Sequence, residues 1–219
     1  MIEDIFLVNG EKYITYRMLG KGKGGYSYLA KKLNHPEGEI VFKSFDAQKE
    51  EYIDESRLTV SLLTDSFPSG YMFDGFDIVP AGYVLLKKIH HEPCDYYTFG
   101  NKIEAEKADY KKLVAAGIRV PKMYSVDEDA EIIVKEFIDG PTVADLVSRG
   151  ELRDEVLSQG VEMAEKAKAA GLNIDYYPTN FILDKNGVLY YIDYECNPYM
   201  EEWSFDNWGK KYWTKSQNS

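Results

Sequence analysis

The chain changes character at Asp139-Gly140-Pro141. Most segments before this break alternate apolar and polar residues, as β-strands do, whereas helical periodicity dominates after it. Glycine weakens helices and strands alike, and proline lacks the amide proton that both need, so regular structure ends here. The sequence therefore predicts a mixed α+β fold in which a short hinge joins a strand-rich half to a helix-rich half.

The segments of the first half are assigned from the periodicity of apolar residues and from Gly, Pro, Ser and Asp residues, which interrupt helices and strands. Strands are expected over 11–19, 26–33, 39–45, 82–89, 119–126 and 131–138. Helices are expected over 47–63 and over 101–116, the second ending at Gly117, and residues 65–76 are expected to form a loop. In the second half we expect helices over 142–149 and 151–170, then a hairpin of strands 180–183 and 188–192 around Asp184-Lys185-Asn186-Gly187.

Composition narrows the class of protein. A chain of 219 residues buries roughly 70% of its extended surface, enough for a real core or for two small lobes that share a cleft. With 44% hydrophobic and 29% charged residues it is neither a coiled coil nor a disordered chain. The net charge of −11 disfavours nucleic-acid binding. No apolar run approaches the about 20 residues of a membrane span, and the acidic first residues do not indicate a signal peptide.

The cysteine, histidine and tryptophan residues give weaker evidence about the compartment, metal binding and packing. Cys94 and Cys196 lie far apart without a CxxC motif, which favours a reducing cytoplasm. His90 and His91 are neighbours, and adjacent strand residues face opposite ways, so a shared metal ion is disfavoured. The three tryptophans of the last segment are expected to pack against their own half of the molecule.

A glycine cluster stands between the first two predicted strands. Gly20, Gly22 and Gly25 match GxGxxG, but the residues that follow favour a strand rather than the helix of a dinucleotide fold. Tyr26 stands where a Walker A loop has lysine. A strand, a glycine loop and a second strand is the arrangement that covers ATP phosphates in protein kinases. A flexible hairpin turn with solubilising lysines explains the same residues equally well.

Three polar residues near the C-terminus have a suggestive spacing. Asp175 and Asn180 are five residues apart, and Asp193 follows 13 residues after Asn180, across the predicted hairpin. In phosphoryl transfer one carboxylate orients the acceptor hydroxyl, while an amide oxygen and a second carboxylate hold Mg²⁺ against the phosphates. The alternative is that Asp175 and Asn180 are turn residues and Asp193 caps a strand.

With these motifs in order, the chain resembles the protein-kinase-like superfamily. It is most similar to the small atypical branch with the RIO kinases, the minimal KEOPS-complex kinase, the lipopolysaccharide core kinases and the aminoglycoside and choline phosphotransferases. LVAAGIRVPKMYSVDEDAEIIVKEFIDGPTVADL resembles the RIO-like run from helix αC through the hinge, and IDYECNPYMEEWSFDNWG resembles the segment after the metal aspartate in choline-kinase-like proteins. The resemblance covers roughly residues 11–33 and 82–208.

The resemblance implies a bilobal fold. Residues 1–138 would form an N-lobe with the glycine loop, one αC helix and an inserted segment at about 34–80, and residues 139–219 would form a minimal helical C-lobe. Its implied roles are a phosphate-covering loop at Gly20, Gly22 and Gly25, a hinge facing adenine at Glu136 and Phe137, a catalytic Asp175, and Mg²⁺ ligands at Asn180 and Asp193.

The resemblance also implies a lysine that grips the phosphates and pairs with Glu106. Lys43 follows Gly25 by 18 residues, and Lys87 precedes Glu106 by 19, both normal intervals. We favour Lys87, because Lys87-Lys88-Ile89-His90-His91 runs into the helix as in small RIO-like kinases.

Departures from the family pattern leave the acceptor open. Asn173 replaces the usual histidine, Tyr177 replaces a lysine or a small residue, and only 24 residues follow Glu195. No APE-like sequence is present, so the helical platform for peptide substrates does not fit. The resemblance implies a phosphotransferase that depends on ATP and Mg²⁺ and acts on a protein Ser/Thr or on a small-molecule hydroxyl. Its alternative is a pseudokinase that binds nucleotide or acts as a scaffold.

Overall fold

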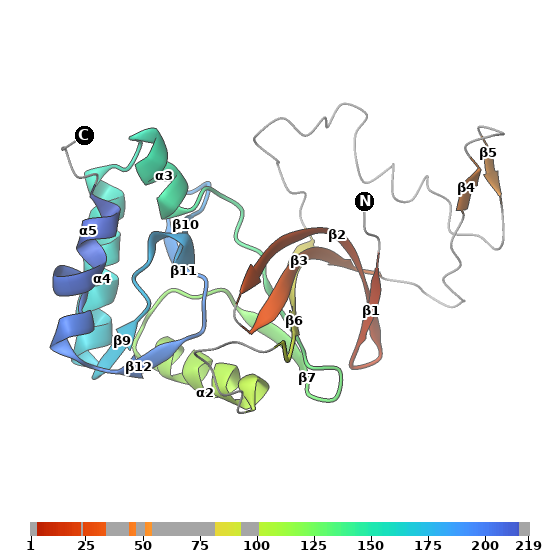
Figure 1. The fold of residues 1–219 in the computed structure, drawn as a ribbon, viewed down its shortest axis with the longest axis horizontal. Helices are drawn as coiled ribbons and strands as arrows, with labels where there is room; N and C mark the ends of the chain where they lie inside the picture. The colour runs from red at the N-terminus through yellow and green to blue at the C-terminus, as the bar shows by residue number, and fades with distance from the viewer. Residues whose placement is uncertain are drawn as a thin grey trace.

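The molecule has a mixed α+β fold with a curled antiparallel sheet. A computed structural model describes residues 4–22, 24–33, 44–46, 51–53, 82–92 and 101–214. Figure 1 shows the sheet on one side, the helices α3, α4 and α5 on the other, and α2 beside the sheet at the junction. The break at residues 139–141 falls between the two halves, as expected.

Six strands form the curled sheet, and every neighbouring pair is antiparallel. Their order is β1 (Ile5–Val8), β2 (Glu11–Gly22), β3 (Gly25–Lys32), β6 (Tyr83–Ile89), β8 (Ile132–Glu136) and β7 (Met123–Asp127). The register between β2 and β3 shifts at Thr15/Arg17 and again at Met18/Gly20. Such irregularities bend a strand and increase its twist, which accounts for the curl of the hairpin.

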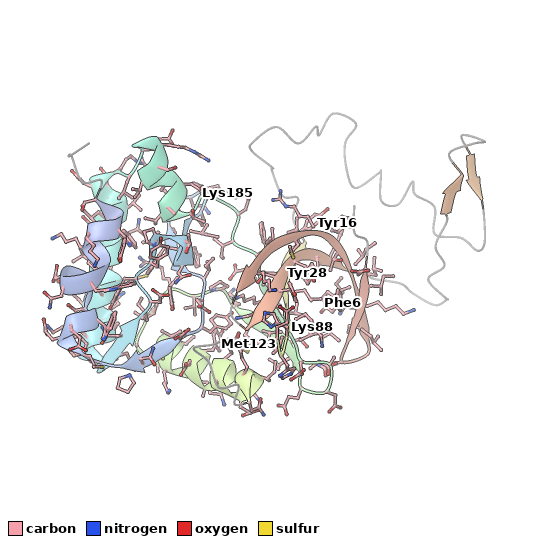
Figure 2. All side chains as sticks on the ribbon, viewed as in Figure 1. Phe6, Tyr16, Tyr28, Lys88, Met123 and Lys185 are labelled. Atoms are coloured by element: carbon pink, nitrogen blue, oxygen red, sulfur yellow. The ribbon has the colours of Figure 1, made fainter. Side chains whose placement is uncertain are left out.

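A small apolar cluster fills the inside of the sheet. Its buried members are Val8, Tyr13, Ala30, Leu86, Ile132 and Val134. Phe6 and Tyr28, both labelled in Figure 2, pack against this cluster with their rings 5.8 Å apart. The sheet therefore has a core of its own.

Helix α2 (Lys102–Ala115) connects the sheet to the helical half. The Asn101 side chain caps it by accepting a hydrogen bond from the amide of Glu104 at 3.1 Å, and Gly117 ends it with a φ of 71°. Ile103 packs against the sheet residues Ile89 and Ile133. Glu106 lies one turn later on the same face and is buried.

The helical half contains α3 (Val143–Arg149), α4 (Asp154–Ala169) and α5 (Lys210–Trp213). Two short antiparallel ladders accompany them, β9 (Leu172–Ile174) with β12 (Cys196–Pro198), and the hairpin β10 (Phe181–Leu183) with β11 (Leu189–Tyr191). Its core is large and aromatic, and the biggest fully buried side chains there are Trp213, Tyr176, Tyr191, Tyr194 and Phe181. Met123, which Figure 2 labels, packs against this core and also against the cluster of Ile89, Ile103 and Ile133.

The connection between the halves is anchored at both ends. On the sheet side the amide of Glu136 donates to the carbonyl of Lys122 at 2.8 Å. On the helical side the amide of Leu183 donates to the carbonyl of Pro141 at 3.1 Å, and Thr142 forms a bridge with Ile182. A β-carbon at Gly140 would collide with the carbonyl oxygen of Leu183, so this position requires glycine.

Several sequence expectations need correction. The helix expected over 47–63 is wrong at residues 51–53, which form β5 (Glu51–Ile53) in a two-stranded ladder with β4 (Ser44–Asp46); Tyr52 and Ile53 favour a strand. The strand expected from residue 119 begins at Met123, because Pro121 cannot join a ladder. Lys43, Cys94 and the loop 65–76 lie outside the described residues, as does most of the proposed insertion.

None of the helices within the described ranges combines the length and the apolar character that crossing a lipid bilayer requires.

Replacement of Gly160 tests the packing of the core in the helical half. A β-carbon at Gly160 in α4 would lie 2.6 Å from Cζ3 and 2.8 Å from Cη2 of Trp213. Alanine normally stabilises a helix by about 1 kcal/mol over glycine, but forcing a methyl group into a filled core costs roughly 1–3 kcal/mol. We expect Gly160→Ala to lower the free energy of unfolding in urea. Ser158→Ala, at an exposed position of the same helix, is the control and should not destabilise.

Candidate functional site

A buried ion pair joins the sheet to α2. Lys87 lies on β6, a central strand, and its Nζ is 2.5 Å from Oε1 of Glu106 on α2. The side chains are only 13% and 7% exposed. The structure thus brings together the lysine and the glutamate that the sequence singled out. Lys43, the alternative partner, is outside the described residues.

Neighbouring charges explain why this ion pair is stable although both side chains are buried. Burial acts to lower the pKa of Lys87, but the carboxylates of Glu106 and Asp193 outweigh burial and raise the pKa above its usual range. Among the described residues, Oε2 of Glu106 has no hydrogen-bond partner, and Oε1 is contacted by Nζ of Lys87. The ion pair with Lys87 is therefore the main compensation for burying this carboxylate.

Asp193 approaches the ion pair from the helical half. It follows β11, and its Oδ1 accepts a hydrogen bond from the amide of Tyr194 at 2.8 Å. Burial acts to raise the pKa of Asp193, but Lys87 and Lys135 lower it below the usual range. Asp193 is therefore a carboxylate at neutral pH.

Asn180 lies beside the same segment. It ends the 3₁₀ turn Pro178–Asn180, and its carbonyl accepts a hydrogen bond from the amide of Ile192 at 2.9 Å. Its side-chain nitrogen donates to the carbonyl of Asp175 at 3.4 Å, whereas its side-chain oxygen accepts no hydrogen bond from the described residues. The backbone bond places Asn180 next to the residue that precedes Asp193.

Asp175 stands in the loop after β9 with an exposed side chain. Its Oδ1 accepts a hydrogen bond from the amide of Tyr177 at 3.0 Å, which forms a local turn. Its own amide donates to the hydroxyl oxygen of Tyr191 at 3.3 Å, and that hydroxyl donates to the carbonyl of Glu195 at 2.8 Å. A buried tyrosine thus holds the loop while the carboxylate remains accessible from outside.

Asn173 ties this loop to the C-terminal segment. It is buried, its Nδ2 donates to the carbonyl of Trp203 at 2.9 Å, and its Oδ1 accepts from the amide of Met200 at 2.5 Å. The described contacts of Asn173 are therefore structural.

The glycine cluster forms the turn of the hairpin between β2 and β3, as the sequence predicted. Gly22 pairs with Gly25 across the turn. A β-carbon on Gly25 would lie 2.8 Å from the carbonyl oxygen of Lys88, so the neighbouring strand requires glycine here. At Gly20 a β-carbon would meet nothing within 4 Å, so steric contact within the chain does not explain this glycine.

A cavity of about 1080 Å³ separates this hairpin from the helical half. Its walls include Gly20, Gly22, Leu85, Lys135, Glu136, Phe137, Asn180 and Ile192. The structure therefore brings the two glycines, the segment at Glu136 and Phe137, and Asn180 to one cavity. The side chains of Lys87, Glu106, Asp175 and Asp193 do not contribute to the described walls, and Gly25 does not either.

Lys135 was not among the predicted site residues, although a lysine directly after the apolar residues 132–134 was a visible signal. Lys135 is only 4% exposed; its Nζ donates to the carbonyl of Ile192 at 2.7 Å and lies 4.2 Å from the ring centre of Tyr194. Burial and the charge of Lys87 lower its pKa to about 8. Lys135 is thus a second buried ammonium group beside the ion pair.

The pKa of Lys135 predicts how stability depends on pH. In the unfolded chain the pKa of Lys135 is 10.5, so the folded chain binds this proton less tightly. The buried ammonium group therefore costs stability below pH 8. The cost falls between pH 8 and 10.5 and is absent above. Relative to Lys135→Met, wild-type unfolding free energy should therefore rise across this window, by up to about 3 kcal/mol. The unfolding free energies are measured by urea titration without nucleotide and with EDTA. Values for the wild type and Lys135→Met that change with pH in parallel would contradict this prediction.

The remaining candidates have other roles. The ring of His90 contacts the carbonyl of Gly22, whereas His91 bonds Glu131, so the two histidines diverge. Burial raises the pKa of Cys196 to about 12, which makes it a poor nucleophile. Trp213 is buried, and its Nε1 donates to the carbonyl of Tyr176 at 2.8 Å. Across the described ranges, no three His, Cys, Asp or Glu residues gather into a metal cluster.

A kinase domain is among the solved structures that are similar to this chain. The crystal structure of the BubR1 kinase domain aligns with 88% of this chain and 49% of its own, with a TM-score of 0.46 and 16% sequence identity. The present chain thus spans about half the length of that protein. No protein-family model matches the chain, and no curated protein matches its sequence. The assignment of a function therefore depends on the chain's own geometry.

Proposed function

We propose that the chain is an ATP-dependent phosphotransferase with a two-lobed, protein-kinase-like fold that transfers the γ-phosphoryl group to a hydroxyl. The observation that carries the proposal is the buried ion pair of Lys87 and Glu106, on which the charge of Asp193 also acts. The first two come from the sheet and α2, and the third comes from the far half of the chain. Charged groups whose pKa values are shifted by burial and by specific charged partners are typical of functional sites.

The cavity supports a nucleotide in particular. Its walls include both the glycine hairpin at Gly20 and Gly22 and the segment at Glu136 and Phe137. Gly20 and Gly22 leave room for phosphates to approach the backbone. The amide of Glu136 already donates to the carbonyl of Lys122, so a backbone donor to a base would come from the following residues.

Asn180 and Asp193 fit Mg²⁺. The side-chain oxygen of Asn180 accepts no hydrogen bond from the described residues, and Asp193 is ionised. Amide and carboxylate oxygens are the hard ligands that Mg²⁺ prefers, and two protein ligands suffice because phosphates and water complete the shell. When bound, the ion would neutralise charge on the β- and γ-phosphates.

The protein groups then have distinct tasks. Lys87, held by Glu106, would neutralise phosphate oxygens, and Asp175 would orient the acceptor hydroxyl and take its proton as the oxygen attacks phosphorus. The exposure of Asp175 suits an acceptor that arrives from outside. The acceptor would be a protein Ser/Thr or a small-molecule alcohol, and a reducing cytoplasm is the expected setting.

Ligand-induced stabilisation tests this proposal. A ligand that binds only the folded chain stabilises it by mass action, so ATP with Mg²⁺ should raise the melting temperature more than either alone. The absence of any shift at millimolar concentrations would reject the nucleotide site. A shift that Asp193→Asn leaves unchanged, without ADP formation by the wild type, would instead favour the pseudokinase alternative.

A further inference from the structure

A second lysine approaches the glycine hairpin from α2. A β-carbon placed on Gly24 would overlap Cδ, Cε and Nζ of Lys102. The ammonium end of Lys102 therefore lies directly against the turn between Gly22 and Gly25. The GxGxxG pattern leaves position 24 unspecified, and a side chain there would displace the end of Lys102.

Lys102 also belongs to the charge cluster around the ion pair. It is one helical turn before Glu106, so both side chains emerge on one face of α2. Burial and the charge of Lys87 lower the pKa of Lys102, while Glu106, Asp193 and Glu195 oppose this effect. Lys102 thus stands between the hairpin and the candidate catalytic groups.

Three lysines belong to this cluster. Lys87 is paired with Glu106 at 2.5 Å, and Lys102 and Lys135 add two further ammonium groups, while Asp193 and Glu195 add carboxylates. The ammonium end of Lys102 lies against the glycine hairpin, where a phosphate would accept a charge-assisted hydrogen bond from it.

From the contact with Gly24 and the proximity to the ion pair, we propose that Lys102 is a second phosphate-binding lysine that contacts the terminal phosphates of the nucleotide beneath the glycine hairpin. The inference rests on the proposed function, since it assigns a residue to the same nucleotide site. Lys102 would act as a binding residue and would take no part in proton transfer.

The test compares nucleotides with different numbers of phosphates. A hydrogen bond between charged groups is worth enough to change affinity about tenfold. Lys102→Met should therefore weaken binding of ATP with Mg²⁺ by about tenfold and binding of AMP by less than about twofold. Lys102→Arg should recover most of the ATP affinity. Isothermal titration of each variant gives both constants.

Lys111→Met is the matched control. Lys111 is exposed and lies nine residues after Lys102, which places it on the opposite side of α2 at 100° per residue. This variant should bind ATP as the wild type does. Equal ATP affinities of Lys102→Met and the wild type would overturn the role of Lys102 alone. A wild type that binds no ATP would overturn the proposed function and, with it, this role.

Amine labelling of the wild type gives a second readout that does not depend on how the variant folds. ATP with Mg²⁺ should protect Lys102 from acylation, as measured by mass spectrometry, while labelling of Lys111 should be unchanged. Labelling of Lys102 at the same rate with and without saturating ATP would contradict the contact.

Discussion

Asp175→Asn is expected to reduce phosphoryl transfer by a factor on the order of 10²–10⁴, the usual scale for loss of a general base. The change keeps the size of the side chain and one oxygen that can accept the amide of Tyr177, but it removes the charge that takes the hydroxyl proton. Binding of ATP with Mg²⁺ should change little, because Lys87, Asn180 and Asp193 remain.

Turnover and affinity must be measured on one preparation to make this prediction sharp. ADP formation reports turnover, and titration with ATP and Mg²⁺ reports affinity. Asp206→Asn, whose side chain is 83% exposed, is the control and should match the wild type in both. Equal losses of affinity and turnover in Asp175→Asn would show that Asp175 is a metal ligand or a structural residue instead.

Lys87→Met is expected to lower turnover by about 10²-fold or more, because a fixed positive charge is lost where phosphate charge develops. It should also destabilise the fold by about 3–5 kcal/mol, since Glu106 is left buried without its partner. Lys88→Met is the control. Lys88 points to the other face of β6 and donates to the carbonyl of Ala130.

A double variant separates the two effects of Lys87. Lys87→Met with Glu106→Leu removes both buried charges, and a well-packed apolar pair is often as stable as the ion pair it replaces. We expect the double variant to regain most of the unfolding free energy but none of the turnover. Activity that survives in Lys87→Met and is lost in Lys43→Met would make Lys43 the phosphate-gripping residue.

Much of the described fold could be predicted from the sequence. Long periodic segments such as α2 and β2 were placed correctly, and Gly117 and Gly187 marked the end of a helix and the turn of a hairpin. The strands β1, β9 and β12 were missed, because segments of three or four residues carry too little periodicity. Their pairing partners lie elsewhere in the chain and decide their structure. The equally short β10 and β11 were predicted only because a hairpin turn joins them.

The sequence singled out some residues of the candidate site and gave no indication of others. Motif spacing singled out Asp175, Asn180 and Asp193, because their order along the chain is itself the signal, and their roles stay predictions. Lys102 and Lys135 could not be assigned by spacing, since their significance lies in what surrounds them: Gly24 for the first, and Ile192 with Tyr194 for the second. Burial of a charged side chain is a property of the folded state alone.

The anchored connection between the halves limits how the cavity can open. Hydrogen bonds hold Glu136 to Lys122, the residue before β7, and hold Pro141 to β10, which leaves residues 137–140 as the segment between the two anchors. A pivot confined to these residues lies at one wall of the cavity. Displacement grows with distance from a pivot, so rotation would move the tip of the glycine hairpin most and the wall at Glu136 least. Ligand exchange would then be asymmetric: the phosphate end would be uncovered while the opposite wall kept its shape.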